Sequence, residues 1–168
     1  MGRLSLPQRV RVTGLAVTLA TTACGAHHVT TIAPTDPETA VRSFLNAVKS
    51  SNMGTLRELW GSERGPASTY LDSKQVEQRL TVIKTYLEHD RFEFAQPNEV
   101  DPANSAQRIV RVRLTRNGCQ PVVPITTVRW GAGWLVKNID LSAAGNPARP
   151  CNASAPTPSA PTPSRPGT

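Results

Sequence analysis

The sequence predicts an α+β domain in which N-terminal helices pack on a curved antiparallel sheet of about four strands. Two observations predict this class. Apolar residues recur at helical spacing between residues 36 and 88, whereas apolar and polar residues alternate between residues 91 and 141. Helices and strands that form separate blocks along the chain are typical of α+β domains. We therefore expect a single domain over residues 36–141.

The first helix is expected to begin at Pro37 and to end between Ser50 and Asn52. Asp36 suits the N-cap, because its carboxylate can accept a hydrogen bond from a free backbone N–H of the first turn. Proline is favoured at the first helical position, and an acidic residue there complements the helix dipole. The apolar face consists of Val41, Phe44, Leu45 and Val48.

A short second helix and a longer third helix follow, separated by a break at residues 61–66. The third helix is expected to end at about Glu88, and its apolar residues are spaced four, three and four apart, which places them on one face. That stripe consists of Val76, Leu80, Ile83 and Leu87. The second helix contains Leu56, Leu59 and Trp60. The candidate N-caps are Asn52 or Thr55 for the second helix and Asp72 or Ser73 for the third.

Four strands are expected after the helices, with a loop at residues 98–104. Asn117-Gly118 is a strong hairpin signal between the second and third strands, because both residues tolerate the backbone of a tight turn. Pro121 and Pro124 lack the N–H of a ladder hydrogen bond, so we expect an edge or a bulge there. The strands are Arg91–Phe94, Gln107–Thr115, Pro121–Trp130 and Trp134–Leu141.

Three segments of this region carry a resemblance to a known superfamily. They are AVRSFLNAV at residues 40–48, LRELW at residues 56–60 and VRWGAGWLVKNI at residues 128–139. Together they resemble the cone-shaped domains of the nuclear-transport-factor-2-like and SnoaL-like superfamily, and the resemblance covers residues 36–141. It implies a cone-like sheet. Some members are isomerases or hydratases with an Asp, Tyr or His inside the cone, which makes Tyr70, Tyr86, His89 and Asp90 the candidates for acid–base residues here.

Residues 1–23 have the pattern of a secretory signal peptide. The positive residues Arg3, Arg9 and Arg11 precede an apolar stretch from Val12 to Ala20. This stretch is shorter than the roughly 20 residues that a membrane-spanning helix needs. The segment LATTACG at residues 19–25 resembles the lipobox of bacterial lipoproteins, although Thr21 stands where that family usually has a Leu.

The lipobox resemblance implies that the chain is cut before Cys24, that this cysteine is acylated, and that the protein is held on a membrane of the bacterial cell envelope. The alternative is an ordinary secreted protein that is cut near Ala23. In the lipoprotein, residues 24–35 would connect the lipid anchor to the domain. Residues 142–168 are rich in Pro, Ala, Thr and Ser and contain the near repeat APTPS, so we expect a disordered tail.

Two cysteines, Cys119 and Cys151, lie beyond the proposed anchor. In an oxidising envelope such cysteines usually pair, and a bridge between them would tie the start of the tail to the turn of the hairpin. Free thiols or pairing with another chain are the alternatives. Neither cysteine has a Cys or His at the short spacing of a metal site, and the adjacent His27 and His28 lack nearby ligands, so no metal and no cofactor are expected.

The formal charge of +7 falls to +4 once the three leader arginines are removed, and export argues against a nucleic-acid partner. Arginines of the sheet form a basic stripe that either binds an acidic partner or lipid headgroup or is simply solvated. Its members are Arg108, Arg111, Arg113, Arg116 and Arg129, of which Arg111, Arg113 and Arg129 are the candidates for partner binding. Core packing is expected for Trp60, Trp130 and Trp134, with the lining of a ligand cavity as the alternative.

These observations favour a non-enzymatic, membrane-anchored envelope lipoprotein that binds a protein partner or a small apolar ligand. A small cone-fold enzyme of the isomerase or hydratase kind is the alternative, and an accessory or structural module near the cell wall is a third. A buried carboxylate in a cavity would favour the enzyme. A filled apolar core would favour the binding module.

Overall fold

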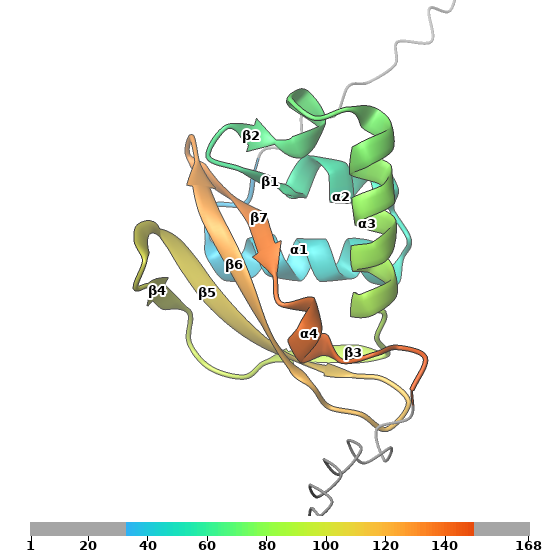
Figure 1. The fold of residues 1–168 in the computed structure, drawn as a ribbon. Coiled ribbons are helices and arrows are strands. Elements are labelled where there is room, and N and C mark those ends of the chain that lie inside the picture. Colours follow the sequence, from blue (N-terminus) through green and yellow to red (C-terminus); the bar gives the residue numbers. More distant parts are fainter. Residues whose placement is uncertain (1–32, 150–168) are drawn as a thin grey trace, which may run out of the picture. The chain divides into compact units, whose positions relative to one another are not determined.

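The computed structural model describes residues 33–149, which form helices followed by a strongly curled antiparallel sheet (Figure 1). The predicted α+β class is therefore confirmed. The helices are α1 (Pro37–Lys49), α2 (Met53–Leu59), the 3-10 helix η1 (Ala67–Thr69), α3 (Ser73–Leu87) and α4 (Leu141–Ala144). The strands are β1 (Gly61–Ser62), β2 (Gly65–Pro66), β3 (Arg91–Phe94), β4 (Glu99–Asp101), β5 (Asn104–Thr115), β6 (Val122–Trp130) and β7 (Gly133–Ile139).

The main sheet has the order β3-β5-β6-β7, and the short strand β4 pairs with one end of β5. All of these pairs are antiparallel, as expected for strands that are joined by short turns. The register between β6 and β7 shifts at Thr126 and Thr127. Such a shift bends a strand and increases its twist, and it contributes here to the curl of the sheet.

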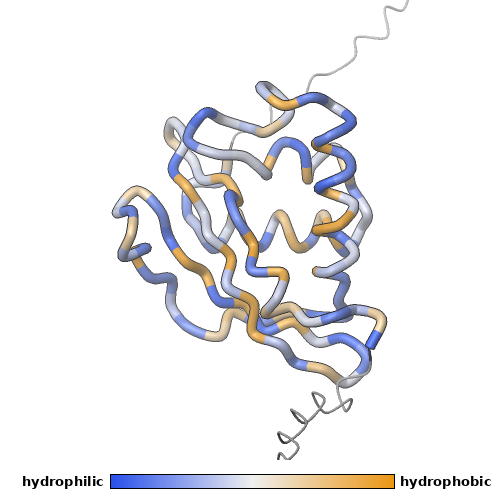
Figure 2. Tube along the Cα trace, in the orientation of Figure 1, coloured by the Kyte–Doolittle hydropathy of each residue, from blue (hydrophilic) through white to orange (hydrophobic). Residues whose placement is uncertain are grey.

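The apolar core lies between the sheet and the helices. Helix α1 contacts β5, β6 and β7, and α3 packs against α1, α2 and α4. The inward-facing side chains of β5 alternate with polar ones, as the sequence pattern predicted, and Figure 2 shows this alternation along the long strands. The fully buried residues of this core include Val41, Phe44, Leu45, Leu80, Leu87, Val110, Val112, Leu114, Val123 and Ile125.

The helix caps agree with the sequence analysis and decide its open alternatives. The carboxylate of Asp36 accepts a hydrogen bond from the backbone N–H of Thr39 at 2.8 Å. Hydrogen bonding to the side chain of Thr39, followed by this backbone bond, lowers the pKa of Asp36. Asn52, and not Thr55, caps α2, because its side-chain oxygen accepts the N–H of Thr55 at 3.1 Å. Asp72 caps α3. Each cap satisfies a backbone donor that has no partner within its helix.

Pro124 lies in β6 with a strand on either side, where a proline is unfavourable. The ladder between β6 and β7 ends one residue later, at the pair Ile125 and Ile139. The carbonyl of Pro124 accepts the N–H of Asp140 on the same side. Pro124 therefore lies at the end of a ladder, where its missing N–H interrupts no pairing.

Four short elements, β1, β2, β4 and α4, lie where the sequence predicted no regular structure. Strands β1 and β2 form a small hairpin within the expected break at residues 61–66, and β4 lies within the expected loop at residues 98–104. These strands have two or three residues each, too few to show an alternating pattern. Helix α4 begins at Leu141, where we placed the end of the domain, and its cap Asp140 accepts the N–H groups of Ser142 and Ala143.

Replacing Leu80 with Ala should lower the free energy of unfolding by about 2–5 kcal/mol, because Leu80 is fully buried and its removal leaves a cavity. The matched change Val82→Ala on the same helix should alter stability little, since Val82 is 50% exposed. Urea denaturation followed by circular dichroism measures both. Equal losses for the two variants would contradict the placement of the core.

Candidate functional site

An apolar groove of about 350 Å³ lies where α3 approaches Trp60 and the start of α4. Its surface is almost entirely apolar, and Val82 stands half exposed within it. The volume falls at the lower end of the roughly 300–1,000 Å³ of small-molecule sites. We call it the Trp60 groove. It is lined by Trp60, Gln78, Arg79, Val82, Ile83 and Leu141.

One wall of the Trp60 groove is formed by helix α3. The helix contributes the side that adjoins its buried apolar stripe. Gln78 and Val82 are four residues apart, as are Arg79 and Ile83, so the four side chains form two adjacent rows. Ile83 belongs to both the core and the groove. A valine at position 82, on an otherwise polar part of the helix, is the sequence signal that could have indicated this site.

Trp60 forms the opposite wall and is held in place by its backbone. Its N–H donates to the carbonyl of Leu56 at 3.0 Å, and its own carbonyl accepts the N–H of Ala67 at 2.8 Å. It also forms a parallel bridge with Val136 at the edge of the sheet. Trp60 as a whole is 9% exposed. The predicted core position of Trp60 is confirmed, and the side chain also lines this groove, whereas ligand binding there stays a prediction.

Arg116 holds α4 in the position that completes the Trp60 groove. Its guanidinium donates a hydrogen bond to the carbonyl of Tyr86, in the last turn of α3. It also donates to the carbonyl of Ala144 at 2.5 Å and to the carbonyl of Gly145 at 3.3 Å. The side chain is 8% exposed. A cation suits the negative end of the helix dipole. The wall residue Leu141 is therefore held through the C-terminal end of its own short helix.

The structure corrects the expectation of one basic stripe on the sheet. Arg116 is buried, and Arg111 forms an ion pair with Glu99 at 2.7 Å. Arg108 and Arg129 lie over the ring of Trp134, with guanidinium-to-centroid distances of 5.6 Å and 5.3 Å. Because Arg108 and Arg111 are three residues apart in one strand, they point to opposite faces.

The arginines therefore form two separate surfaces. The candidates Arg111 and Arg113 share the face opposite to Val112, whereas Arg129 belongs to the face of Trp134. Partner binding by these three residues stays a prediction. The expected core position of Trp130 is wrong, because this residue is 39% exposed. Its indole lies against Gly65, where an added Cβ would come within 3.1 Å of the indole nitrogen. Gly65 also has a φ of +110°, which favours glycine.

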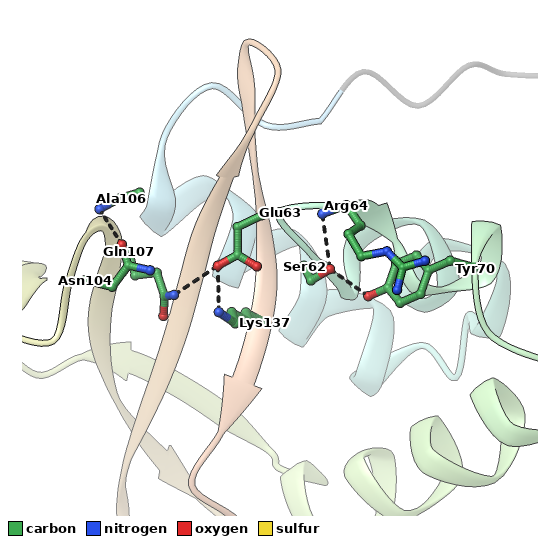
Figure 3. A network of polar contacts seen from close by, with 8 residues as sticks. All are labelled: Ser62, Glu63, Arg64, Tyr70, Asn104, Ala106, Gln107 and Lys137. Atoms are coloured by element: carbon green, nitrogen blue, oxygen red, sulfur yellow. Dashed lines mark hydrogen bonds and ion pairs between the residues drawn. The ribbon is translucent and has the colours of Figure 1, made fainter.

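A polar network fixes the β1–β2 hairpin to the sheet and to η1 (Figure 3). The carboxylate of Glu63 accepts hydrogen bonds from Lys137 at 2.6 Å and from Gln107 at 3.1 Å. The Lys137 hydrogen bond is the main reason that the pKa of Glu63 is lowered. The Tyr70 hydroxyl donates to Ser62 at 2.9 Å, and its ring lies under the guanidinium of Arg64. These contacts position the segment that follows Trp60.

The four candidate acid–base residues do not form one site. Tyr70 belongs to the hairpin network, whereas the backbone carbonyl of Tyr86 is a partner of Arg116. His89 and Asp90 line a cavity of about 280 Å³ together with Arg116. His89 is buried and Asp90 is exposed. Of the four candidates, only His89 and Asp90 line this cavity, and a catalytic role for them stays a prediction.

Few polar side chains are buried among the described residues. Their buried polar side chains are His89, Gln107, Arg116 and Thr127, so no carboxylate is among them. Residues 33–149 contain no cluster of three or more His, Cys, Asp or Glu side chains that could hold a metal ion. Within the same range, no helix is both long and apolar enough to cross a membrane.

Several predictions fall on residues outside the described range, namely the signal peptide, the acylation of Cys24, the tether, and most of the tail with Cys151. Cys119 lies in the turn between β5 and β6, where its backbone exchanges two hydrogen bonds with Arg116, at 2.7 Å and 3.1 Å. The pairing of Cys119 with Cys151 stays a prediction. It would act on the same turn that carries the Arg116 side chain.

Comparison with known proteins assigns the chain to no family. No family model and no curated protein matches the sequence. A solved structure of a phospholipid-binding protein from Ralstonia solanacearum, in complex with a phospholipid, is similar at 16% sequence identity with a TM-score of 0.36. The match covers 63% of this chain and 75% of that chain. Similarity at this level is no evidence for a shared ligand.

Replacing Arg116 with Gln should lower the free energy of unfolding by at least about 1.5 kcal/mol, because buried carbonyls lose hydrogen bonds to a charged donor. It should also speed hydrogen exchange at the amides of Gly145 and Arg149, which are bonded within the C-terminal segment. The control is Arg113→Gln on the adjoining strand β5. Unchanged exchange in Arg116→Gln would show that this residue does not hold α4.

Proposed function

We propose that this protein is a non-enzymatic binding module of the bacterial cell envelope that holds the alkyl chain of a small apolar ligand in the Trp60 groove. The observation that carries the proposal is the nearly complete apolar lining of a groove of about 350 Å³ on the surface. Covering this surface with an alkyl chain would stabilise the complex by about 0.8 kcal/mol for each methylene group that is buried.

An alkyl chain fits the lining better than a polar or aromatic metabolite. Such metabolites need a few convergent hydrogen-bonding groups that set their orientation. The groove offers the side chains of Gln78 and Arg79, both on α3, beside four apolar residues. A flexible chain needs contact area and makes few demands on orientation, and a protein anchored at a membrane would be next to a supply of such chains.

The absence of a buried carboxylate among residues 33–149 supports a binding module over the cone-fold enzyme. Acid–base catalysis needs a group with a suitable pKa within hydrogen-bond reach of the reacting atom. The described core is filled by apolar side chains, and of the four candidate residues only His89 and Asp90 share a cavity, in which Asp90 is exposed. A role as an accessory module near the cell wall is compatible with the same groove.

The lipid anchor and the disulfide belong to the proposal. Acylation of Cys24 would hold the domain at the membrane surface, with residues 24–35 as the connection. A Cys119–Cys151 bridge would reinforce what Arg116 does, because both act between the β5–β6 turn and the C-terminal segment. The groove wall formed by α4 would then be held from two sides.

Binding should be lost when a charge enters the groove. The exported protein carrying Cys24→Ser, which cannot be acylated, is titrated with 1-octanol and followed by the methyl NMR signals of Ile83. Val82→Glu should weaken binding at least about tenfold, because an ionised carboxylate resists transfer to an apolar site. Val82 is half exposed, so the fold should tolerate the change.

Thr81→Glu is the matched control, because Thr81 is an exposed neighbour on α3 that does not line the groove. It should bind octanol as the unsubstituted protein does. Equal affinity of the two variants would refute the Trp60 groove as the binding site.

Mass spectrometry of the protein purified from bacterial membranes tests the anchor and the disulfide. We expect a mature chain that begins at an acylated Cys24 and, without reduction, a linked pair of peptides that contain Cys119 and Cys151. Reduction should separate the two peptides and serves as the control. An unmodified Cys24, or a mature chain that begins elsewhere, would refute the anchor.

A further inference from the structure

A second cavity, of about 340 Å³, lies between the C-terminal half of α1 and the start of β3. Its lining differs in kind from the Trp60 groove, because cationic side chains dominate it. We call it the basic cavity. It is lined by Arg42, Asn46, Lys49, His89, Arg91 and Phe92.

The helical repeat brings the α1 residues of the basic cavity together. Arg42, Asn46 and Lys49 are four and three residues apart, so they share one face of α1. Arg91 is the first residue of β3 and supplies a third cation from the other wall. Two arginines and one lysine therefore converge on one concave site.

Contacts with the protein restrain each of the three cations. The Arg42 guanidinium lies 4.7 Å from the centroid of the Phe94 ring. The Lys49 ammonium donates a hydrogen bond to the carbonyl of Asp90 at 2.5 Å. The Arg91 Nε lies 3.4 Å from the Thr115 hydroxyl. Groups restrained in this way lose less conformational freedom when they bind a ligand.

His89 adds a buried polar group to the wall of the basic cavity. The side chain is 6% exposed, and its Nδ1 lies 2.7 Å from the carbonyl of Leu87. A carbonyl is an acceptor, so Nδ1 carries the proton of this bond. Nε2 is buried and has no hydrogen-bond partner among the described residues. Nε2 could donate a hydrogen bond to a phosphate oxygen only in the imidazolium form, in which both ring nitrogens carry a proton.

The charge of the basic cavity is not offset by its own lining, which contains no carboxylate among the described residues. Glu88 and Asp90 flank His89 in the chain, but they line the separate cavity beside Arg116. Three like charges that share one concave site repel one another, and a bound anion would relieve that repulsion.

We infer that the basic cavity binds a phosphate group. A phosphate offers several acceptor oxygens and close to two negative charges, which matches two guanidinium forks and one ammonium group. A carboxylate, with two oxygens and one charge, would satisfy one arginine and leave the others unpaired. Inorganic phosphate has this charge, whereas the phosphodiester of a lipid headgroup offers the same kind of phosphoryl oxygen but only two of them and one negative charge, so it would pair with fewer of the three cations.

The inference is tested on the full mature protein in a non-ionic detergent at constant ionic strength. Inorganic phosphate is titrated by calorimetry, and a second titration uses glycerophosphoglycerol, the phosphodiester that remains when the acyl chains of phosphatidylglycerol are removed. Saturable binding of either probe at one site per chain is expected. Tighter binding of the diester identifies a lipid headgroup as the ligand, and tighter binding of inorganic phosphate identifies the free ion.

Arg42→Gln and Arg91→Gln should each weaken binding of the preferred probe about tenfold, and circular dichroism checks that both variants fold. Lys74→Gln removes an exposed cation from α3, outside the basic cavity, and should leave the affinity unchanged. The inference is overturned if neither probe binds saturably, or if all three variants bind as tightly as the unsubstituted protein. Neither result depends on the Trp60 groove.

Discussion

A buried guanidinium joins parts of this domain that lie far apart in the sequence. Arg116 extends from the end of the β5–β6 ladder to the last turn of α3 and to the carbonyls behind α4. Hydrophobic burial explains why α1, α2 and α3 cover the sheet, but α4 has four residues and buries little. A helix of that length has no stability of its own, so its position depends on the bonds at its ends.

The dependence on Arg116 connects the fold to the proposed binding site. One wall of the Trp60 groove is the first residue of α4, and another is the side of α3 next to the core stripe. The third wall, Trp60, is placed by a bridge to β7 and by the segment that Glu63 and Lys137 hold on the sheet. The groove is thus a product of tertiary contacts between four regions of the chain.

Because the groove depends on contacts between distant regions, the sequence predicted the main helices and strands but not the groove. The periodic stripe of α3, the alternation in β5 and the caps Asp36 and Asp72 are local patterns, and they predicted the main elements correctly. The hairpin β1–β2, β4 and α4 are too short to carry a period. The burial of Arg116 and the exposure of Trp130 depend on distant neighbours, so residue type misled the prediction at both positions. The groove could not be predicted, because it depends on the position of α4 and no local pattern in the sequence indicates that position.

The two sides of α3 have different freedom to change over evolution. Val76, Leu80 and Leu87 are fixed by the packing of the core, whereas Gln78 and Val82 face outward and touch the groove. Substitutions at the outward positions can alter the width and polarity of the groove with little effect on folding. Related chains could therefore acquire different ligand preferences while they keep the same architecture, and the residues that set the preference would be among the most variable of the helix.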